Sequence, residues 1–346
     1  MSKQPRIGYS GFGAYLPATV LTNDELERIV ETSDGWIRRR TGICARRILD
    51  EDETILDMAV CASQRALADA GVTAEQLGDI RVGVNTWLRF PSLATQLQRE
   101  LGADNASASD VSAGCAGFIY AVEEAHNKIF VERVRQDREM IALVVGVEAL
   151  SHITDWTDRN TCVLLGDGAG AVVLREVSEG GILNIYTHAQ GDYGHLLYSA
   201  SVLENQREPS GKQPFKHEKQ CDRPYLRMDG PKVYTIAIET MVHDINKVIE
   251  RYNETAAQPI GISDIDYLYP HQANLRIIEK VAHRLNVPLE KVYTEGIVHY
   301  GNTSTASIPI GYWENRTQNN GHSAGRLEMD VAFGAGFASG AILRQT

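Results

Sequence analysis

The sequence lacks any run of basic residues and any long hydrophobic run. Its 346 residues contain 34 Lys and Arg against 45 Asp and Glu, which gives a net charge of -11 at pH 7. This balance excludes a protein that binds nucleic acid through a broad basic surface, although the Arg clusters at 38–40 and 46–47 could meet a smaller anionic ligand. No apolar run approaches the ~20 residues that span a bilayer, and no leader-like segment opens the chain. We therefore expect a soluble, cytoplasmic protein with no nucleic-acid or membrane partner.

Cysteine is scarce and irregularly placed. The odd number of cysteines and the absence of a Cys-x-x-Cys pair are typical of a protein from a reducing compartment. The spacing does not match a zinc site, so we predict no metal. The five cysteines are Cys44, Cys61, Cys115, Cys162 and Cys221.

One of these residues, Cys115, has the surroundings of a nucleophile. It lies among very small residues, 112–117, and apolar residues with a helical rhythm follow at 118–130. A thiol at the start of a helix would face unpaired backbone N–H groups, which favour the reactive thiolate. Small neighbours would also let a substrate carbonyl approach closely. A buried structural cysteine fits this segment about equally well, so other residues must decide.

Two further turns carry polar side chains that assist such a cysteine in enzymes. His271 follows a short apolar run that ends at Pro270, and it precedes an amphipathic segment that ends at Leu285. Asn302 lies in a turn of small residues, 300–307, before another apolar stretch. Either residue alone is more often structural. Together with Cys115 they form the combination expected of a covalent nucleophile and its assistants.

Gly-rich segments indicate a duplication. Residues 165–175 and 333–344 are each a Gly/Ala turn that leads into a short apolar strand, and Arg175 and Arg344 are 169 positions apart. The chain is long enough for two domains or one duplicated domain. We predict an N-terminal half, 1–178, that carries the nucleophile, and a C-terminal half, 179–346, that carries His271 and Asn302.

Strands and helices alternate along the chain, which favours an α/β fold. We predict helices at 26–40, 55–70, 228–252 and 275–285, the second of which ends at Gly71. The apolar run 141–146 predicts a strand that is covered on both faces. The charged tract 131–140 predicts a solvated helix extension, and the polar tract 203–223 predicts a loop.

These features resemble the 3-oxoacyl-[acyl-carrier-protein] synthase III family, condensing enzymes of the thiolase superfamily. The resemblance covers nearly the whole chain. It implies an α/β, thiolase-like, duplicated α-β-α-β-α five-layer fold with a five-stranded mixed sheet in each half, and a homodimer. The segments that carry it are Thr32-Ser33-Asp34-Gly35-Trp36-Ile37, Arg40-Thr41-Gly42-Ile43, Cys115-Ala116-Gly117-Phe118, Asp158-Arg159-Asn160-Thr161, Gly166-Asp167-Gly168-Ala169-Gly170, His271-Gln272-Ala273-Asn274 and Gly301-Asn302-Thr303-Ser304.

The resemblance also implies a chemistry. Cys115 would take an acyl group from an acyl thioester, and His271 and Asn302 would hydrogen-bond the carbonyl of a malonyl-type thioester. As carbon dioxide leaves, these donors would stabilise the enolate, which attacks the acyl-cysteine and gives a 3-oxoacyl product in fatty-acid or polyketide biosynthesis. The N–H groups of Cys115 and Ala335 would form the oxyanion hole.

Substrates of this family are thioesters of coenzyme A or of the phosphopantetheine on acyl carrier protein, and the resemblance implies no resident cofactor. Trp36 and Arg159 would stack on either side of the adenine of coenzyme A, and Arg40 would meet its phosphates. A core aromatic at Trp36 and a surface ion pair at Arg159 are the structural alternatives.

Other residues would contact the rest of the substrate or the partners. Gly230 and Phe333 would line the substrate site, and Phe90 would reach the acyl pocket of the partner subunit. Arg276 and Arg284 would face acyl carrier protein, although an exposed solvated helix face explains them nearly as well.

Two departures from the family concern the substrate. The chain has Ala338-Ser339-Gly340 where fatty-acid enzymes of the family carry Thr-Trp-Gly, and the tracts 131–140 and 203–223 are longer than usual. These differences favour a polyketide or other secondary-metabolite branch.

Two other functions remain open. One is an acyltransferase that passes the acyl group from Cys115 to an alcohol or amine. Asn302 counts against it, because relatives with that activity carry an acid there. The other is a non-catalytic partner subunit, and the intact cysteine, histidine and asparagine count against that.

Overall fold

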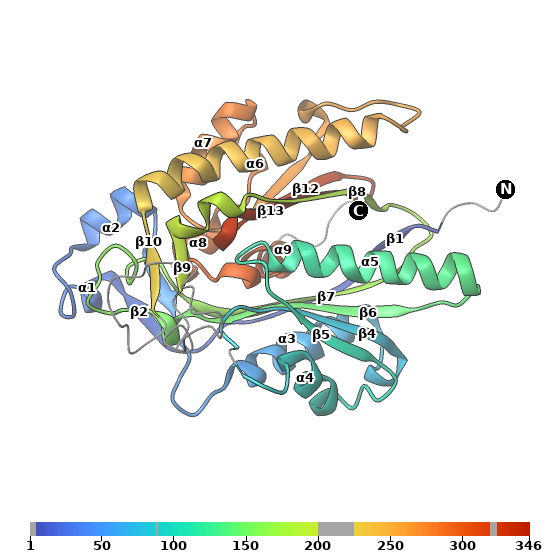
Figure 1. The fold of residues 1–346 in the computed structure, drawn as a ribbon, viewed down its shortest axis with the longest axis horizontal. Coiled ribbons are helices and arrows are strands. Elements are labelled where there is room, and N and C mark those ends of the chain that lie inside the picture. Colours follow the sequence, from blue (N-terminus) through green and yellow to red (C-terminus); the bar gives the residue numbers. More distant parts are fainter. Residues whose placement is uncertain (1–4, 88, 200–224, 319–323) are drawn as a thin grey trace, which may run out of the picture.

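The computed structural model describes residues 5–87, 89–199, 225–318 and 324–346. The predicted loop at 203–223 and Cys221 lie outside the described residues. The described chain forms two mixed sheets with helices between them and helices on both outer faces (Figure 1). The predicted α/β five-layer fold is thus confirmed.

The first sheet comes from the N-terminal half. Its strands lie in the order β1-β7-β6-β4-β5. β4 pairs in parallel with β5 and β6, whereas β7 pairs antiparallel with β6 and β1. The apolar run at 141–146 begins β6, which is buried along nearly all of its length, as predicted. The bounds are β1 Ile7–Tyr15, β4 Leu77–Gly83, β5 Ser107–Val111, β6 Ile141–Ala149 and β7 Asp167–Glu176.

The second sheet comes from the C-terminal half and has the order β11-β12-β13-β8. β11 and β12 are parallel, and the other two pairs are antiparallel. The expectation of five strands is wrong for the described part of this sheet. A single parallel bridge between Leu268 and Val292 stands at the fifth position, because the chain turns into α8 (Glu295–Tyr300) shortly afterwards. The bounds are β8 Gly181–Ala189, β11 Tyr267–Pro270, β12 Leu327–Phe333 and β13 Ala338–Gln345.

The two sheets share one topology. Strands β4, β6, β7 and β1 of the first sheet correspond in order and direction to β11, β12, β13 and β8 of the second. Arg175 and Arg344, the pair that indicated a duplication, lie on the corresponding strands β7 and β13. The boundary at residue 178 falls in the connection between β7 and β8, and it remains a prediction.

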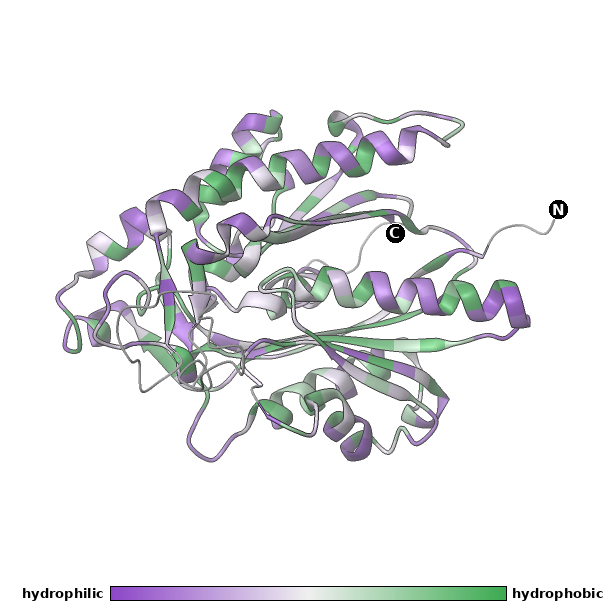
Figure 2. Cartoon of the chain, viewed as in Figure 1, coloured by the Kyte–Doolittle hydropathy of each residue, from purple (hydrophilic) through white to green (hydrophobic). Residues whose placement is uncertain are grey.

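Helices make up the other three layers. α5 (Gly117–Gln136) and α9 (Ser307–Gln318) contact both sheets from between them. α3 (Ile55–Ala70) and α4 (Leu93–Leu101) cover the outer face of the first sheet, and α6 (Gly230–Asn253) and α7 (Leu275–Leu285) lie on the outer face of the second. Figure 2 shows inner strands that are mostly hydrophobic, and outer helices that carry both hydrophobic and hydrophilic residues. The hydrophobic core accordingly has three main clusters: one under α3 and α4, one between the two sheets around α5 and α9, and one under α6 and α7.

Helix boundaries follow from capping residues. α3 and α7 have the predicted bounds, and α3 ends at Gly71, whose φ of 63° is left-handed. The predicted helix at 26–40 is wrong: it is α1 (Asn23–Leu26) followed by α2 (Asp34–Thr41), because the Ser33 side chain caps a new helix start by accepting from the Trp36 N–H. α6 begins at Gly230 rather than 228, with Pro231 in its first turn. The extension of α5 stops at Gln136, before the left-handed Asp137.

Two short strand pairs and a 3-10 helix complete the fold. β2 (Val20–Thr22) pairs with β3 (Ala45–Arg47), and β9 (Leu197–Ser199) pairs with β10 (Leu226–Met228), both antiparallel. A one-turn 3-10 helix, Ser304–Ala306, packs directly onto β6. At this contact Gly146 of β6 faces the carbonyl oxygen of Thr305, which would lie 2.2 Å from any added Cβ.

We predict that Gly146→Ala destabilises the protein, because the new methyl group would overlap the Thr305 backbone and push the two halves apart. The loss should be about 1–3 kcal/mol of unfolding free energy, the usual range for overpacking a rigid contact. Chemical denaturation measures it. Gly191→Ala is the matched control, since nothing lies within 4 Å of its added Cβ. Equal denaturation midpoints for the two variants would contradict this packing.

Candidate active site

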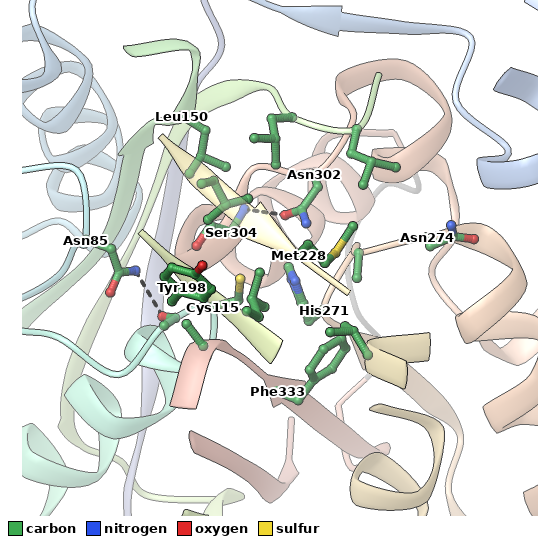
Figure 3. Close-up of a pocket in the computed structure, with 18 of the residues that line it drawn as sticks. Asn85, Cys115, Leu150, Tyr198, Met228, His271, Asn274, Asn302, Ser304 and Phe333 are labelled. Atoms are coloured by element: carbon green, nitrogen blue, oxygen red, sulfur yellow. Dashed lines mark hydrogen bonds between the residues drawn. The ribbon is translucent and has the colours of Figure 1, made fainter. Parts of the chain in front are cut away.

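A cavity of about 1450 Å³ lies where the two halves meet. It is bounded by the turn before α5, the turn after β11, the turn before α9, and the small β9–β10 sheet. Cys115, His271 and Asn302 all line it, each at the end of one of these turns (Figure 3). The structure therefore brings together the three side chains that were singled out in the sequence.

Cys115 lies in a turn that is pressed against a second turn from the other half. Gly114 has a φ of 55°, a left-handed conformation that glycine adopts without strain. A Cβ on Gly114 would lie 2.3 Å from the backbone N of Ala335, and a Cβ on Gly334 would lie 2.2 Å from the backbone N of Cys115. Only bare backbone fits at this contact, which brings the N–H groups of Cys115 and Ala335 to the same end of the cavity.

The sulfur of Cys115 rests as a thiol. The residue is partly exposed, but only to the interior of the cavity. Its pKa is raised to about 12, chiefly by burial and also by the Glu148 carboxylate, while a hydrogen bond with the Ser304 hydroxyl lowers it. The expectation that the start of a helix would by itself favour the thiolate is wrong, because removal from water outweighs the backbone N–H groups.

His271 is a neutral imidazole. It follows β11, is 1% exposed, and packs edge-on against Phe333 with ring centroids 5.8 Å apart. Burial lowers its pKa to about 3, so the ring stays uncharged at neutral pH. Its Nδ1 lies 2.8 Å from the Oγ of Ser307, the first residue of α9.

The hydrogen bonds of Ser307 define which nitrogen of His271 carries the hydrogen. Ser307 Oγ accepts from the backbone N–H of Gln272 at 3.3 Å, and within the described residues its own hydroxyl hydrogen has His271 Nδ1 as its partner. A buried hydroxyl seldom leaves its hydrogen unpaired, so Ser307 donates to Nδ1. The ring hydrogen is then on Nε2, on the opposite edge of the ring.

Asn302 is oriented by the backbone around it. Its own N–H donates to the carbonyl of Leu164 at 2.8 Å and its carbonyl accepts from Gly166 N–H at 3.0 Å, which ties this turn to the N-terminal half. Its side-chain Oδ1 accepts from the backbone N–H of Ser304 at 2.8 Å. The carboxamide therefore turns its NH2 end toward the cavity (Figure 3).

Comparison with known proteins identifies the family. The 3-oxoacyl-[acyl-carrier-protein (ACP)] synthase III family model matches residues 109–191, and the C-terminal model of the same family matches residues 255–345. A beta-ketoacyl-[acyl-carrier-protein] synthase III from Xanthomonas campestris pv. campestris is 41% identical over 344 residues, which cover 99% of each chain. The chain belongs to the 3-oxoacyl-[acyl-carrier-protein] synthase III family. It is therefore an acyltransferase of the condensing type.

Solved structures of this family agree over the whole chain. The 3-oxoacyl-[acyl-carrier-protein] synthase III of Aquifex aeolicus is 38% identical with a TM-score of 0.85, and the match covers 98% of this chain and 100% of that one. The priming beta-ketosynthase of the R1128 polyketide pathway is 31% identical with a TM-score of 0.83, covering 100% and 97%. The chain thus resembles both fatty-acid-type and polyketide-priming members of the synthase III family.

The residues predicted to bind coenzyme A lie at the mouth of the cavity. Trp36 and the exposed Arg40 line it. The guanidinium of Arg159 lies over the Trp36 ring, 5.1 Å from its centroid, and donates to the Glu31 carbonyl at 3.0 Å. A purine between the two side chains would need about 7 Å, or two stacking contacts of about 3.5 Å. The predicted sandwich is therefore closed here, and a base could enter only if Arg159 moved.

The other predicted residues are divided between cavity and surface. Gly230, Phe333 and Arg276 line the cavity, and Arg276 is exposed beside Tyr234 at its rim. Arg284, in the last turn of α7, is exposed outside it. Phe90 is fully exposed in the single chain. Within the part of the chain that the structure describes, no helix could span a membrane and no cluster of His, Cys, Asp or Glu could hold a metal ion.

Sequence reasoning missed the residues that support the three catalytic candidates. Ser307, Ser304 and Glu148 contact them or the backbone beside them, but all three are buried and two of them stand in a run of small residues like any turn. Only Glu148 left a signal, as a lone charge in the otherwise apolar strand β6.

We predict that Ser307→Ala changes the protonated nitrogen of His271. In the wild type the ring should be neutral with its hydrogen on Nε2 at pH 7, and without the Ser307 donor the Nδ1–H form should appear. Nitrogen NMR of labelled histidine distinguishes the two forms. The exposed His299 provides an internal control whose signals should not change. Unchanged His271 signals in the variant would contradict the assigned hydrogen bond.

Proposed function

We propose that Cys115 accepts an acyl group from an acyl thioester and that the enzyme then condenses it with a malonyl-type thioester, with loss of carbon dioxide, to give a 3-oxoacyl thioester. One observation carries this proposal. A cysteine thiol, a neutral imidazole and a carboxamide, supplied by both halves of the chain, line one cavity. Family membership supports the same reaction type.

In the first half-reaction the sulfur of Cys115 attacks the thioester carbon. Negative charge then develops on the carbonyl oxygen, and the backbone N–H groups of Cys115 and Ala335 are the donors that stabilise it. The contact between the turns at Gly114 and Gly334 supports this role, because no side chain separates the two N–H groups from the reacting carbon. The coenzyme or carrier thiol leaves, and the acyl group stays on the cysteine.

In the second half-reaction a malonyl-type thioester loses carbon dioxide beside His271 and Asn302. The electrons of the broken carbon–carbon bond move onto the thioester oxygen, where an Nε2–H and a carboxamide N–H donate to it. Both donors are uncharged and held in position by Ser307 and by the Ser304 backbone. They need little reorganisation as the charge forms. The enolate carbon then attacks the acyl-cysteine.

Residues at the mouth of the cavity are proposed to bind the molecules that deliver the substrates. Arg40 and Trp36 are proposed to hold coenzyme A, with Arg159 moving to admit the base. Arg276 and Arg284, on the exposed side of α7, are proposed to meet the acidic acyl carrier protein that brings the malonyl group. We also propose a homodimer in which Phe90, which no described part of its own chain covers, packs into the partner.

The acyltransferase alternative receives no support from the orientation of Asn302. Transfer to an alcohol or amine needs a group that removes a proton from the acceptor. The carboxamide oxygen of Asn302 already accepts from Ser304 N–H, and its NH2 end can only donate. Condensation uses donors and needs no such base at this position.

We predict that His271→Ala and Asn302→Ala separate the two half-reactions. Each should lower the rate of malonyl-thioester decarboxylation about 100- to 1,000-fold, as expected when one oxyanion donor is removed. Short acyl-coenzyme A esters should still acylate Cys115 in both variants. Intact-protein mass spectrometry measures this acylation. Loss of acylation with decarboxylation intact would refute the assigned roles.

His299→Ala provides the matched control. This histidine is exposed on α8, where it pairs with Glu295 at 3.3 Å, and it lies outside the cavity lining. Both half-reactions should proceed in this variant at the wild-type rate. A loss as large as that of His271→Ala would show that the effect does not come from the site.

A further inference from the structure

Glu148 is a fully buried carboxylate directly behind the active site. It lies near the end of β6 and is 0% exposed. Its Oε1 accepts from Asn85 Nδ2 at 2.6 Å and from Ser304 Oγ at 3.1 Å, and its Oε2 accepts from the N–H and hydroxyl of Thr86 at 3.0 and 2.8 Å. A buried carboxylate with this many donors is a built feature of the site, because an unpaired one would be strongly destabilising.

The partners of Glu148 are the turns that carry the reacting groups. Asn85 Nδ2 also donates to the carbonyl of Gly114, the residue before Cys115, at 3.0 Å (Figure 3). Ser304 belongs to the turn that orients Asn302. Ser304 adopts a φ of 51°, which is unusual for a residue with a side chain. This conformation lets its hydroxyl contact both the Cys115 sulfur and the Glu148 carboxylate.

The three groups form a continuous hydrogen-bonded chain. Ser304 Oγ donates to Glu148 Oε1 at 3.1 Å and is also a hydrogen-bond partner of the Cys115 sulfur. With its own hydrogen on Glu148, Ser304 Oγ can accept the hydrogen of the resting thiol. The chain can also run in the opposite direction, with a protonated Glu148 donating to Ser304 and Ser304 donating to a thiolate. No hydrogen bond is lost between the two arrangements, because a hydroxyl both donates and accepts.

We propose that Glu148, through the hydroxyl of Ser304, receives and holds the proton of Cys115 while the sulfur attacks the acyl thioester. This proposal rests on the function proposed above, in which Cys115 is the nucleophile. Ser304 touches the reacting sulfur, whereas Glu148 acts through Ser304.

Atoms and charges balance over the cycle. The S–H proton moves to Ser304 Oγ, the Ser304 hydroxyl proton moves to Glu148 Oε1, and the sulfur uses its electron pair to bond the thioester carbon. The bond from that carbon to the leaving sulfur breaks, and the leaving thiolate takes a proton from water. When condensation later breaks the acyl–Cys115 bond, the electron pair returns to sulfur and the proton returns from Glu148 by the same route.

The electrostatics of the pair agree with this exchange. Two acids that are close together in a buried site cannot both ionise, so one proton is shared between them. Burial raises the pKa of Glu148, which makes it a better proton acceptor than an exposed glutamate. His271, whose pKa burial lowers to about 3, is a poor competitor for the proton.

Other titratable groups also line the cavity. The phenols are Tyr120, Tyr198 and Tyr234. The charged groups are Asp110 on β5, Glu124 on α5, Arg40 on α2, Asp229 before α6 and Arg276 on α7. None of them is among the causes of the pKa shift of Cys115, where Glu148 is the one charged contributor.

The test is how the rate constant for alkylation of Cys115 by iodoacetamide depends on pH between about pH 6 and pH 8. Intact-protein mass spectrometry measures the extent of alkylation at each time point. If the proton stays inside the pair, the wild-type rate constant should be nearly independent of pH. In Glu148→Gln the proton must leave to solvent, so the rate should rise about tenfold per pH unit. His271→Ala should remain as flat as the wild type. A purely structural Glu148 would not produce this change of slope.

Ser304→Ala serves as a second variant if Glu148→Gln does not fold. It keeps the Glu148 carboxylate and removes the hydroxyl that passes the proton to it. It should slow alkylation at pH 7 about tenfold or more and restore the pH dependence. A wild-type rate that rises tenfold per pH unit overturns the proposal. So does a Glu148→Gln or Ser304→Ala profile as flat as the wild type, or a pH dependence that appears in His271→Ala.

Acylation by short acyl-coenzyme A esters is measured in parallel on the wild type. Absence of an acyl adduct at Cys115 would refute the proposed function without affecting the alkylation profile. A normal adduct combined with a steep wild-type profile would refute only the role of Glu148. The two failures are therefore distinguishable.

Discussion

Two turns, one from each half of the chain, approach each other backbone to backbone, and the site is arranged around this contact. Gly114 and Gly334 allow it, because a Cβ on either would overlap backbone atoms of the other turn. The same approach brings the N–H groups of Cys115 and Ala335 together. The first turn follows β5 of the N-terminal sheet and the second follows β12 of the C-terminal sheet, so the contact joins the two sheets. The central helices α5 and α9 then start at the site and point away from it.

The three catalytic candidates are uncharged in the resting site. Cys115 is a thiol, His271 is a neutral ring and Asn302 is uncharged, and Glu148 is the charged residue whose field raises the pKa of the thiol. Such an arrangement suits a reaction in which charge appears only briefly, first on a tetrahedral oxygen and then on an enolate. Fixed neutral donors stabilise those charges without first having to release a partner ion.

Local sequence was sufficient to predict the features that depend on neighbouring residues. Cys115 and His271 each lie in a turn that follows a strand, Asn302 lies in a turn of small residues after α8, and each turn stands beside an apolar run. Side chains in such turns often face a cleft. The duplication was predictable because the segments that end at Arg175 and Arg344 are each a Gly/Ala turn followed by an apolar strand. Features that depend on distant contacts were not predictable. Ser307 acts on a histidine 36 positions away, and Glu148 reaches Ser304 across 156 positions. The predicted helix 26–40 is split because Ser33 caps a new helix start. The second sheet has only a single bridge in place of a fifth strand because the chain enters α8 soon after Val292.

The most direct test of these roles is a crystal structure of the protein with a short acyl group on Cys115. We expect an acyl carbonyl oxygen between the backbone N–H groups of Cys115 and Ala335, with His271 Nε2 and the Asn302 NH2 facing the open space where the second thioester would lie. An acyl oxygen that points away from Ala335, or an acyl group that fills the space between His271 and Asn302, would contradict these roles.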